Sequence, residues 1–236
     1  MRARIAAAAK RAGRDPAEVT LVAVSKTQSA EEVAAAYAAG LRLFGENRVE
    51  EAGPKVQAVT RLLAPTPAPD WHMVGHLQSR KAGDVVPWAT MVHSVDSVKL
   101  ALRLSRFCIA AGKELPILLE VNISGEASKY GLAPEALSAL VEQAIEPPGF
   151  PGLRLEGLMT MAPIASDPEL VRPVFARLRG ARDDLARRYP ALNWRHLSMG
   201  MTDDFEVAIE EGATMVRIGR AIFGAPGPCA TGRTRR

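Results

Sequence analysis

Cysteines, aromatic residues and long apolar runs are all scarce in this 236-residue sequence. Its two cysteines, Cys108 and Cys229, are too few for a disulfide framework, so we expect a reducing, cytoplasmic location. Aromatic residues account for only 5% of the chain, which leaves aliphatic side chains and methionine to form the core. No stretch approaches the ~20 apolar residues of a membrane span, and no signal peptide is recognisable. We therefore expect no membrane partner.

Positive charge is in modest excess and is not concentrated in one place. The net charge is +4, and basic residues gather in segment 2–14 and at the end of the chain. No aromatic residues are interleaved with them and no nucleic-acid-binding motif is present, so we predict solvated basic faces and no nucleic-acid partner. Because residues 225–236 combine proline and glycine with arginine, we expect a flexible basic C-terminal tail there.

Strand-like and helix-like segments alternate along the chain, which is typical of α/β folds. Short apolar runs predict eight strands, at residues 21–25, 41–44, 71–74, 90–93, 116–121, 154–158, 195–197 and 215–218. Helical segments separate them, and one more helix is expected at 2–12. With 47% hydrophobic residues, the chain can form one sizeable core.

These segments predict a single (β/α)8 TIM barrel over residues 1–224, with an extra N-terminal helix. The alternative fold is an open, doubly wound sheet. That fold would need a glycine-rich turn after the first strand, and residues 25–27 (SKT) contain no glycine.

Lys26 directly follows the first predicted strand. Barrels and open α/β sheets place their reactive groups at the carboxyl ends of parallel strands. A lysine at that position presents an amine to the barrel mouth, although a lone lysine at a strand end is more often an ordinary surface residue. Two segments near the C-terminus favour the functional interpretation.

Both late segments have the composition of phosphate-binding loops. In TIM barrels, phosphate is often held by the loops after the seventh and eighth strands. Here the seventh strand leads into residues 198–204 (SMGMTDD), where Gly200 permits a close backbone approach and Thr202 and Asp203 are suitable helix N-caps. The eighth strand leads into residues 219–224 (GRAIFG). Ordinary strand-to-helix turns remain the alternative.

Arg217 lies inside an apolar strand, where a guanidinium needs a partner. Strand alternation puts it on the same face as Met215 and Gly219. One possible partner is a barrel carboxylate, such as Glu46 or Glu120, and the other is a ring nitrogen of a bound cofactor.

An amine, a phosphate site and an arginine around one barrel mouth suit pyridoxal 5′-phosphate (PLP). Lys26 would form a Schiff base with this cofactor, and Arg217 would face its pyridine nitrogen. Because arginine stays protonated, that nitrogen would remain unprotonated, and a neutral pyridine is a poorer electron sink. This arrangement would restrain carbanion chemistry.

The chain resembles the pyridoxal phosphate homeostasis protein family in motifs that run through nearly its whole length. These motifs are 22–27 (VAVSKT), 44–49 (FGENRV), 71–78 (WHMVGHLQ), 121–124 (VNIS) with 128–131 (SKYG), 157–161 (GLMTM), 197–201 (LSMGM) with 203–204 (DD), and 216–219 (VRIG) with 222–224 (IFG). The sequence departs from the family at Ser29, where proline is common, at Arg220, where a small hydroxyl residue is usual, and after Gly224.

The resemblance implies a PLP-binding barrel similar to the N-terminal domain of alanine racemase. It implies a role in buffering PLP or delivering it to apo-enzymes, and in balancing amino-acid and keto-acid pools, without established catalytic turnover. The cofactor-binding residues that the motifs and the strand pattern imply are Lys26, Asn47, Ser198, Gly200, Met201, Thr202, Arg217, Gly219 and Arg220. Secondary candidates are Lys129 as a transfer acceptor, Tyr130 as a lid and Met159 in the lining of the mouth.

Two other functions stay open at this stage. The first is a small PLP-dependent racemase, lyase or aminotransferase, although the two bases that racemisation needs are not visible. The second is a sugar-phosphate aldolase that uses Lys26. We expect no metal site, because His72 and His76 straddle a strand end without a completing ligand, and we expect His93 and His196 to be hydrogen-bonded structural residues. Without a second domain, a monomer is expected.

Overall fold

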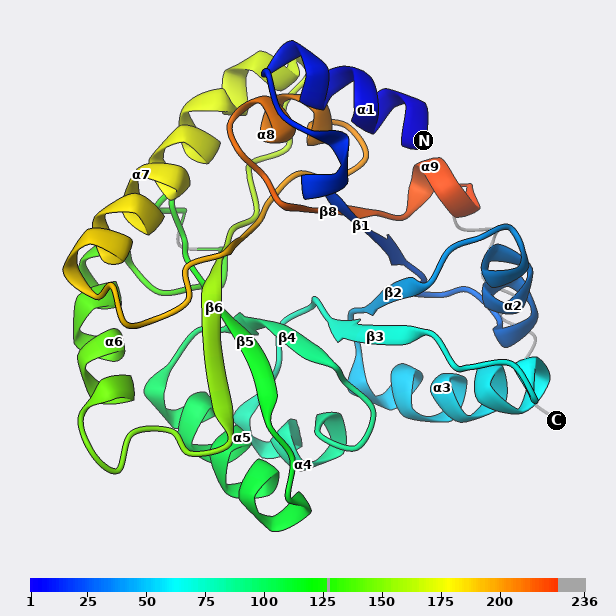
Figure 1. The fold of residues 1–236 in the computed structure, drawn as a ribbon, viewed down its shortest axis with the longest axis horizontal. Coiled ribbons are helices and arrows are strands. Elements are labelled where there is room, and N and C mark those ends of the chain that lie inside the picture. Colours follow the sequence, from blue (N-terminus) through cyan, green and yellow to red (C-terminus); the bar gives the residue numbers. More distant parts are fainter. Residues whose placement is uncertain (127, 225–236) are drawn as a thin grey trace, which may run out of the picture.

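A computed structural model describes residues 1–126 and 128–224, and its strands form a closed parallel barrel (Figure 1). Each strand pairs with its neighbours in the sequence, and the last pairs with the first. The strands are β1 (Thr20–Val24), β2 (Leu43–Glu46), β3 (Asp70–Met73), β4 (Met91–Val95), β5 (Leu115–Glu120), β6 (Leu153–Met159), β7 (His196–Ser198) and β8 (Met215–Ile218). The predicted TIM barrel is confirmed, and the open-sheet alternative is wrong. The predicted tail 225–236 lies outside the described residues.

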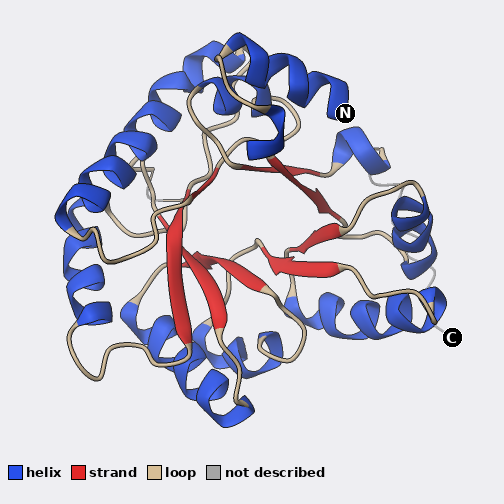
Figure 2. Cartoon of the chain, in the orientation of Figure 1, coloured by secondary structure: helices blue, strands red, loops and turns tan. Residues whose placement is uncertain are grey.

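Helices surround the strands on the outside, as Figure 2 shows in blue around red. The α-helices are α1 (Arg2–Arg11), α2 (Ala30–Ala38), α3 (Val49–Leu63), α4 (Ala82–Val85), α5 (Val98–Ala111), α6 (Leu137–Ile145), α7 (Arg172–Arg188), α8 (Phe205–Glu210) and α9 (Arg220–Phe223). Short 3-10 turns are η1 (Pro16–Glu18), η2 (Ser79–Lys81), η3 (Pro134–Ala136) and η4 (Pro168–Val171). None of the helices in the described part of the chain combines the length and apolar composition that a membrane crossing requires.

The extra N-terminal helix α1 lies beside α8 on the outside of the barrel (Figure 1). Arg4 reaches Glu206 at 3.1 Å and Arg11 reaches Glu210 at 2.7 Å. These exposed ion pairs stabilise the contact only slightly, so the burial of Ile5 and its alanine neighbours contributes more to holding α1 in place.

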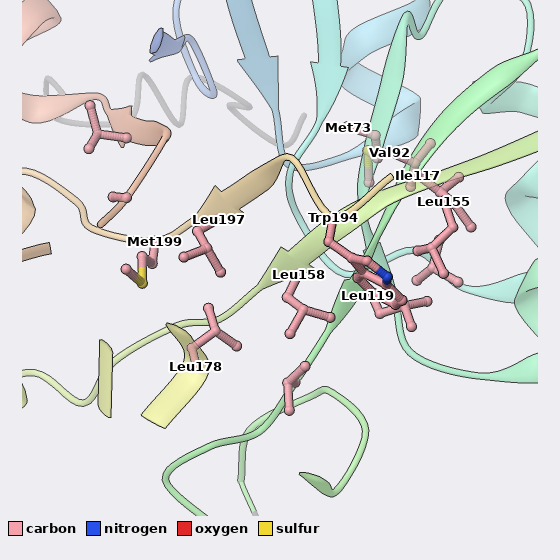
Figure 3. Close-up of a cluster of buried hydrophobic side chains, with 14 of the residues drawn as sticks. Met73, Val92, Ile117, Leu119, Leu155, Leu158, Leu178, Trp194, Leu197 and Met199 are labelled. Atoms are coloured by element: carbon pink, nitrogen blue, oxygen red, sulfur yellow. The ribbon is translucent and has the colours of Figure 1, made fainter. Parts of the chain in front are cut away.

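The core has an outer and an inner part. The outer part fills the space between strands and helices with aliphatic side chains; Leu178 of α7, for example, lies beside Leu197 and Met199 in Figure 3. The inner part fills the barrel itself with Val22, Val74, Met91, Leu118, Met159 and Met215. As the 5% aromatic content implied, aliphatic residues and methionine supply most of both parts.

The expected element boundaries differ from the observed ones in a few places. The single helix expected at 78–86 is instead η2 followed by the short α4. The turn expected after the eighth strand is instead the short helix α9, which Gly219 precedes. Ser29, where the family commonly has proline, caps α2 through a reciprocal pair of hydrogen bonds with Glu32, so this departure leaves the helix start well satisfied.

Candidate functional site

Lys26 leaves the carboxyl end of β1 on an exposed turn. Ser25 still follows the sheet, because its N–H donates to the carbonyl of Gly45 at 2.9 Å. Among the described residues, no side chain makes an ion pair or hydrogen bond with the Lys26 amine. Thr27 has a φ of 66°, a left-handed conformation that costs a β-branched residue about 1–2 kcal/mol. Strain of this kind often marks a functional segment.

Strand register brings Lys26 close to both candidate loops. On one side Val22 pairs with Arg217 and Ala23 with Ile218, so the end of β1 runs beside the loop that begins at Gly219. On the other side Val24 pairs with Gly45, so the same end runs beside the loop after β2. A β-carbon added at Gly219 would lie 3.1 Å from the carbonyl oxygen of Val24, which shows how closely the two segments pack.

Arg217 points into the barrel, where it is only 5% exposed. Its Nη1 donates to the hydroxyl of Ser198 at 2.7 Å and its Nη2 donates to the carbonyl of Thr160 at 2.9 Å. Neither Glu46 nor Glu120 forms an ion pair with it, so the structure does not show the first of the two possible partners, a barrel carboxylate. The second, a cofactor ring nitrogen, stays a prediction. Burial lowers the pKa of Arg217 to about 10, which keeps it charged at neutral pH.

A chain of buried histidines continues from Ser198. His93 Nδ1 lies 2.8 Å from Ser198 Oγ, and His93 Nε2 lies 2.9 Å from Nδ1 of His72. Because a guanidinium only donates, the Ser198 hydroxyl oxygen accepts from Arg217, and its O–H donates to His93 Nδ1. His93 Nε2 then donates to His72.

The two hydrogen-bonded histidines, His72 and His93, are neutral. Burial is the main cause that lowers the pKa of His72 to about 3, and it lowers that of His93 well below its ordinary value. His196 makes separate contacts, to Thr214 Oγ1 at 3.4 Å and to Glu156 at 3.5 Å. The expected hydrogen bonding of His93 and His196 is confirmed, whereas the chain through His72 was not foreseen.

Glu120 is a further buried polar residue and is the last residue of β5. One of its carboxylate oxygens is buried without a hydrogen-bond partner among the described residues. Burial raises the pKa of Glu120 to about 7; the nearby Asp96 adds to this effect and Arg217 opposes it. Burial therefore favours the protonated form of a carboxyl group that lies near the charged arginine.

The loops after β7 and β8 meet at the mouth of the barrel. Gly200 has a φ of 92°, and its carbonyl accepts from the N–H of Arg217 at 3.0 Å. The two loops are also joined through an ion pair between Arg220 and Asp203, whose side chains are 60% and 64% exposed. Two adjacent segments, the loop after β7 and the start of α9, thus contain Gly200, Met201, Thr202, Gly219 and Arg220.

Two sequence-based expectations for these loops need correction. Ser198 is the last residue of β7 and not part of the loop, and its hydroxyl bonds to Arg217 and His93. Its assignment to the cofactor stays a prediction. Asp204, rather than Thr202 or Asp203, is the residue before α8, and its carboxylate accepts from the N–H of Met201 at 2.5 Å. That bond fixes the shape of the loop.

Asn47 and Met159 reach the mouth from β2 and β6. The Oδ1 atom of Asn47 is buried without a hydrogen-bond partner among the described residues, which leaves an acceptor available to a ligand. Gly75 of the next loop packs directly on Asn47, because an added β-carbon there would lie 2.4 Å from the Asn47 carbonyl oxygen. Met159 is the last residue of β6 and belongs to the apolar cluster inside the barrel.

Lys129 and Tyr130 belong to the loop after β5, farther from β1 along the barrel. Lys129 Nζ pairs with Glu126 at 2.9 Å. The exposed ring of Tyr130 stacks on His76 of the loop after β3, with ring centroids 3.6 Å apart. The side chain of Asn122 organises this loop by hydrogen-bonding four of its groups, a role that its place in the 121–124 motif did not indicate.

Known proteins are similar to nearly the whole chain, including all of the segments described above. Residues 1–226 match the model of the alanine racemase N-terminal domain family. A pyridoxal phosphate homeostasis protein of Pseudomonas aeruginosa is 49% identical over 94% of this chain and 91% of its own. A protein of the same name from Aquifex aeolicus is 41% identical over 94% of this chain and 93% of its own.

A solved structure gives the same result. PipY of Synechococcus elongatus with PLP bound superposes with a TM-score of 0.80 at 36% identity, over 93% of this chain and all of PipY. Sequence and fold therefore agree, and this chain belongs to the pyridoxal phosphate homeostasis protein family, whose barrel matches the alanine racemase N-terminal domain model.

Proposed function

We propose that this protein binds PLP and that the amine of Lys26 holds it covalently. The observation that carries the proposal is the strand register, which sets the exposed amine of Lys26 between the loops of Asn47 and Gly219, with no side-chain partner in the part of the chain that the structure describes. The amine attacks the aldehyde carbon of PLP; a C=N bond replaces the C=O bond and one water molecule leaves. An exposed lysine at the mouth meets this aldehyde without any rearrangement of the core.

The residues around Lys26 fit the rest of the cofactor. Backbone N–H groups in the segments around Gly200 and Gly219 suit a phosphate. Both glycines pack closely on their neighbours, because an added β-carbon would lie 2.6 Å from the β-carbon of Ala208 at Gly200 and 3.1 Å from the carbonyl oxygen of Val24 at Gly219. Thr202 adds a hydroxyl donor. Arg217 is anchored by two of its three nitrogens, and Nε, the third, has no hydrogen-bond partner among the described residues, so it is available to a ring nitrogen.

We further propose that the protein carries PLP in the cytoplasm as a monomer and passes it to apo-enzymes. The names of its relatives and the bound cofactor of PipY support the homeostasis role. The guanidinium beside the ring would keep the pyridine nitrogen unprotonated and so restrain turnover. Lys129 and Tyr130, on the other side of the mouth, are the residues that we assign to transfer and to a lid.

The carrier role predicts that the PLP-loaded protein does not turn over amino acids faster than free PLP does. The test is incubation with a panel of L- and D-amino acids, followed by chiral chromatography and keto-acid assay. Steady turnover well above that of free PLP would instead indicate a small racemase or lyase.

A second prediction tests the phosphate loops. Replacement of Thr202 by alanine is expected to weaken PLP binding about 10-fold, because one hydrogen bond to a charged group is lost. Binding of pyridoxal, which has the aldehyde without the phosphate, should not change. Thr60→Ala is the matched control, since its hydroxyl only bonds the Val56 carbonyl on the outside of α3. Equal losses for PLP and pyridoxal would contradict the assignment.

A further inference from the structure

We propose that Glu51 and Lys55 of α3 are positioning residues that hold the Lys26 segment ready for the cofactor aldehyde. This inference rests on the proposed function of Lys26. Both residues bond to the backbone next to Lys26. Lys55 bonds to the carbonyl of Ser25, before it, and Glu51 accepts from the N–H of Thr27, after it.

Lys55 is a buried lysine whose three donor positions are all used. Its Nζ atom lies 2.7 Å from the carbonyl of Ser25, 2.8 Å from Glu46 Oε1 and 2.9 Å from Glu51 Oε1. Its side chain is only 6% exposed. An ammonium group has three N–H donors, so the geometry satisfies this one completely inside the protein.

The residue before Lys26 is held at every polar group. The N–H of Ser25 donates to Gly45 at 2.9 Å, its hydroxyl donates to Glu46 at 2.7 Å, and its carbonyl accepts from Lys55. Glu46 is itself fully buried and ends β2. These bonds tie Ser25 to β2 and α3.

The residue after Lys26 is held by the same cluster. Glu51 accepts the N–H of Thr27 at 2.5 Å through the oxygen that also accepts from Lys55. Thr27 has the left-handed φ of 66°, a strained conformation that persists in a threonine only when surrounding contacts stabilise it. The hydrogen bond to Glu51 is one such contact.

Hydrogen bonds thus hold the backbone of Ser25 and Thr27, on either side of Lys26, while the Lys26 amine has no partner among the described residues. Fixing the backbone on both sides limits the amine to its own side-chain rotations, which lowers the entropy lost when it reaches the cofactor. Glu51 and Lys55 are four residues apart on α3, so one helical face supplies both contacts. The alternative is an ion cluster that only stabilises the fold.

The experiment compares Glu51→Ala with Glu51→Gln, and adds Lys55→Met. For each variant the rate of Schiff-base formation is followed by absorbance after PLP is added to apo-protein, and the melting temperature is recorded. We expect Glu51→Ala and Lys55→Met to slow the reaction about 10-fold. Glu51→Gln should react at close to the wild-type rate, because its amide oxygen still accepts from Thr27.

Lys113→Met is the matched control for lost stability. Lys113 is also partly buried and donates to the carbonyls of Val86 and Ala89, at 2.7 and 2.6 Å, before β5 and away from the mouth. The Lys113→Met substitution should lower the melting temperature without slowing Schiff-base formation.

Wild-type rates in Glu51→Ala would overturn the inference, and so would equal slowing in Lys113→Met. If Lys55→Met does not fold, the two Glu51 variants decide alone, since Glu51 is partly exposed. Failure of the proposed function looks different: wild-type protein would then form no adduct on Lys26 at all.

Discussion

Replacement of Lys26 by alanine is expected to abolish covalent PLP binding. The imine absorbance that appears when PLP is added to the wild-type protein should be missing, and affinity should fall at least ~100-fold because the covalent bond is lost. The fold should be unaffected. The Lys26 side chain is exposed and has no side-chain partner among the described residues, so the free energy of unfolding should change by less than about 0.5 kcal/mol.

Lys129→Ala is the control for this experiment. Its amine lies in the loop after β5 and pairs with Glu126, so its loss should leave the absorbance of the loaded protein in place. A full-strength imine band in Lys26→Ala would show that another amine holds the cofactor. A band that disappears only in Lys129→Ala would contradict the account in the same way.

The second large effect is a pH-dependent gain of stability in Glu120→Gln. Burial raises the folded-state pKa of Glu120 from its ordinary 4.5 to about 7. A carboxyl group with a raised pKa stabilises the fold below pH 4.5, and this contribution is lost as the pH rises toward 7. Glutamine avoids that loss, so the variant should gain up to about 3 kcal/mol over wild type across this window and no more above it.

Denaturant unfolding at several pH values between 4 and 8 measures this difference. The neutral histidines act in the opposite direction, because their lowered pKa values make the fold less stable as the pH falls below 6.5. Their effect is common to both proteins and cancels in the comparison. Glu114→Gln, which alters a carboxylate that is 60% exposed, is the control and should show no such trend. A constant difference between Glu120→Gln and wild type would contradict the assignment.

The sequence alone was sufficient for the barrel and for the place of Lys26. Both depend on local patterns: apolar runs with helical segments between them, and an amine directly after the first run. The closed parallel topology then follows, since neighbouring strands in such a chain pair in order. For the same reason, the meeting of the loops after β7 and β8 was predictable.

The contacts inside the barrel were beyond sequence reasoning. Arg217 was expected to need a partner, but its partners are the hydroxyl of Ser198 and the backbone of Thr160, which no charge pattern indicates. A shift of one residue in the end of β7 moved Ser198 from the loop into the strand. The bond between His72 and His93 joins two strands, and its partners depend on register.

The hydrogen bonds from Glu51 and Lys55 to the Lys26 segment could not be predicted for a similar reason. Glu51 and Lys55 form an ordinary i,i+4 pair on a helix, and such pairs are usually solvent-exposed. Only the packing of α3 against the end of β1 turns this pair inward toward Ser25. A lysine that is four residues after a glutamate gives no sign of burial by itself.

The most direct test of the account is borohydride reduction of the PLP-loaded wild-type protein, followed by peptide mapping by mass spectrometry. Reduction converts the C=N bond into a stable amine, so the modified residue survives digestion. We predict a single phosphopyridoxyl group on the peptide that contains Lys26. An adduct on Lys129 with Lys26 unmodified, or no adduct on any lysine, would contradict it.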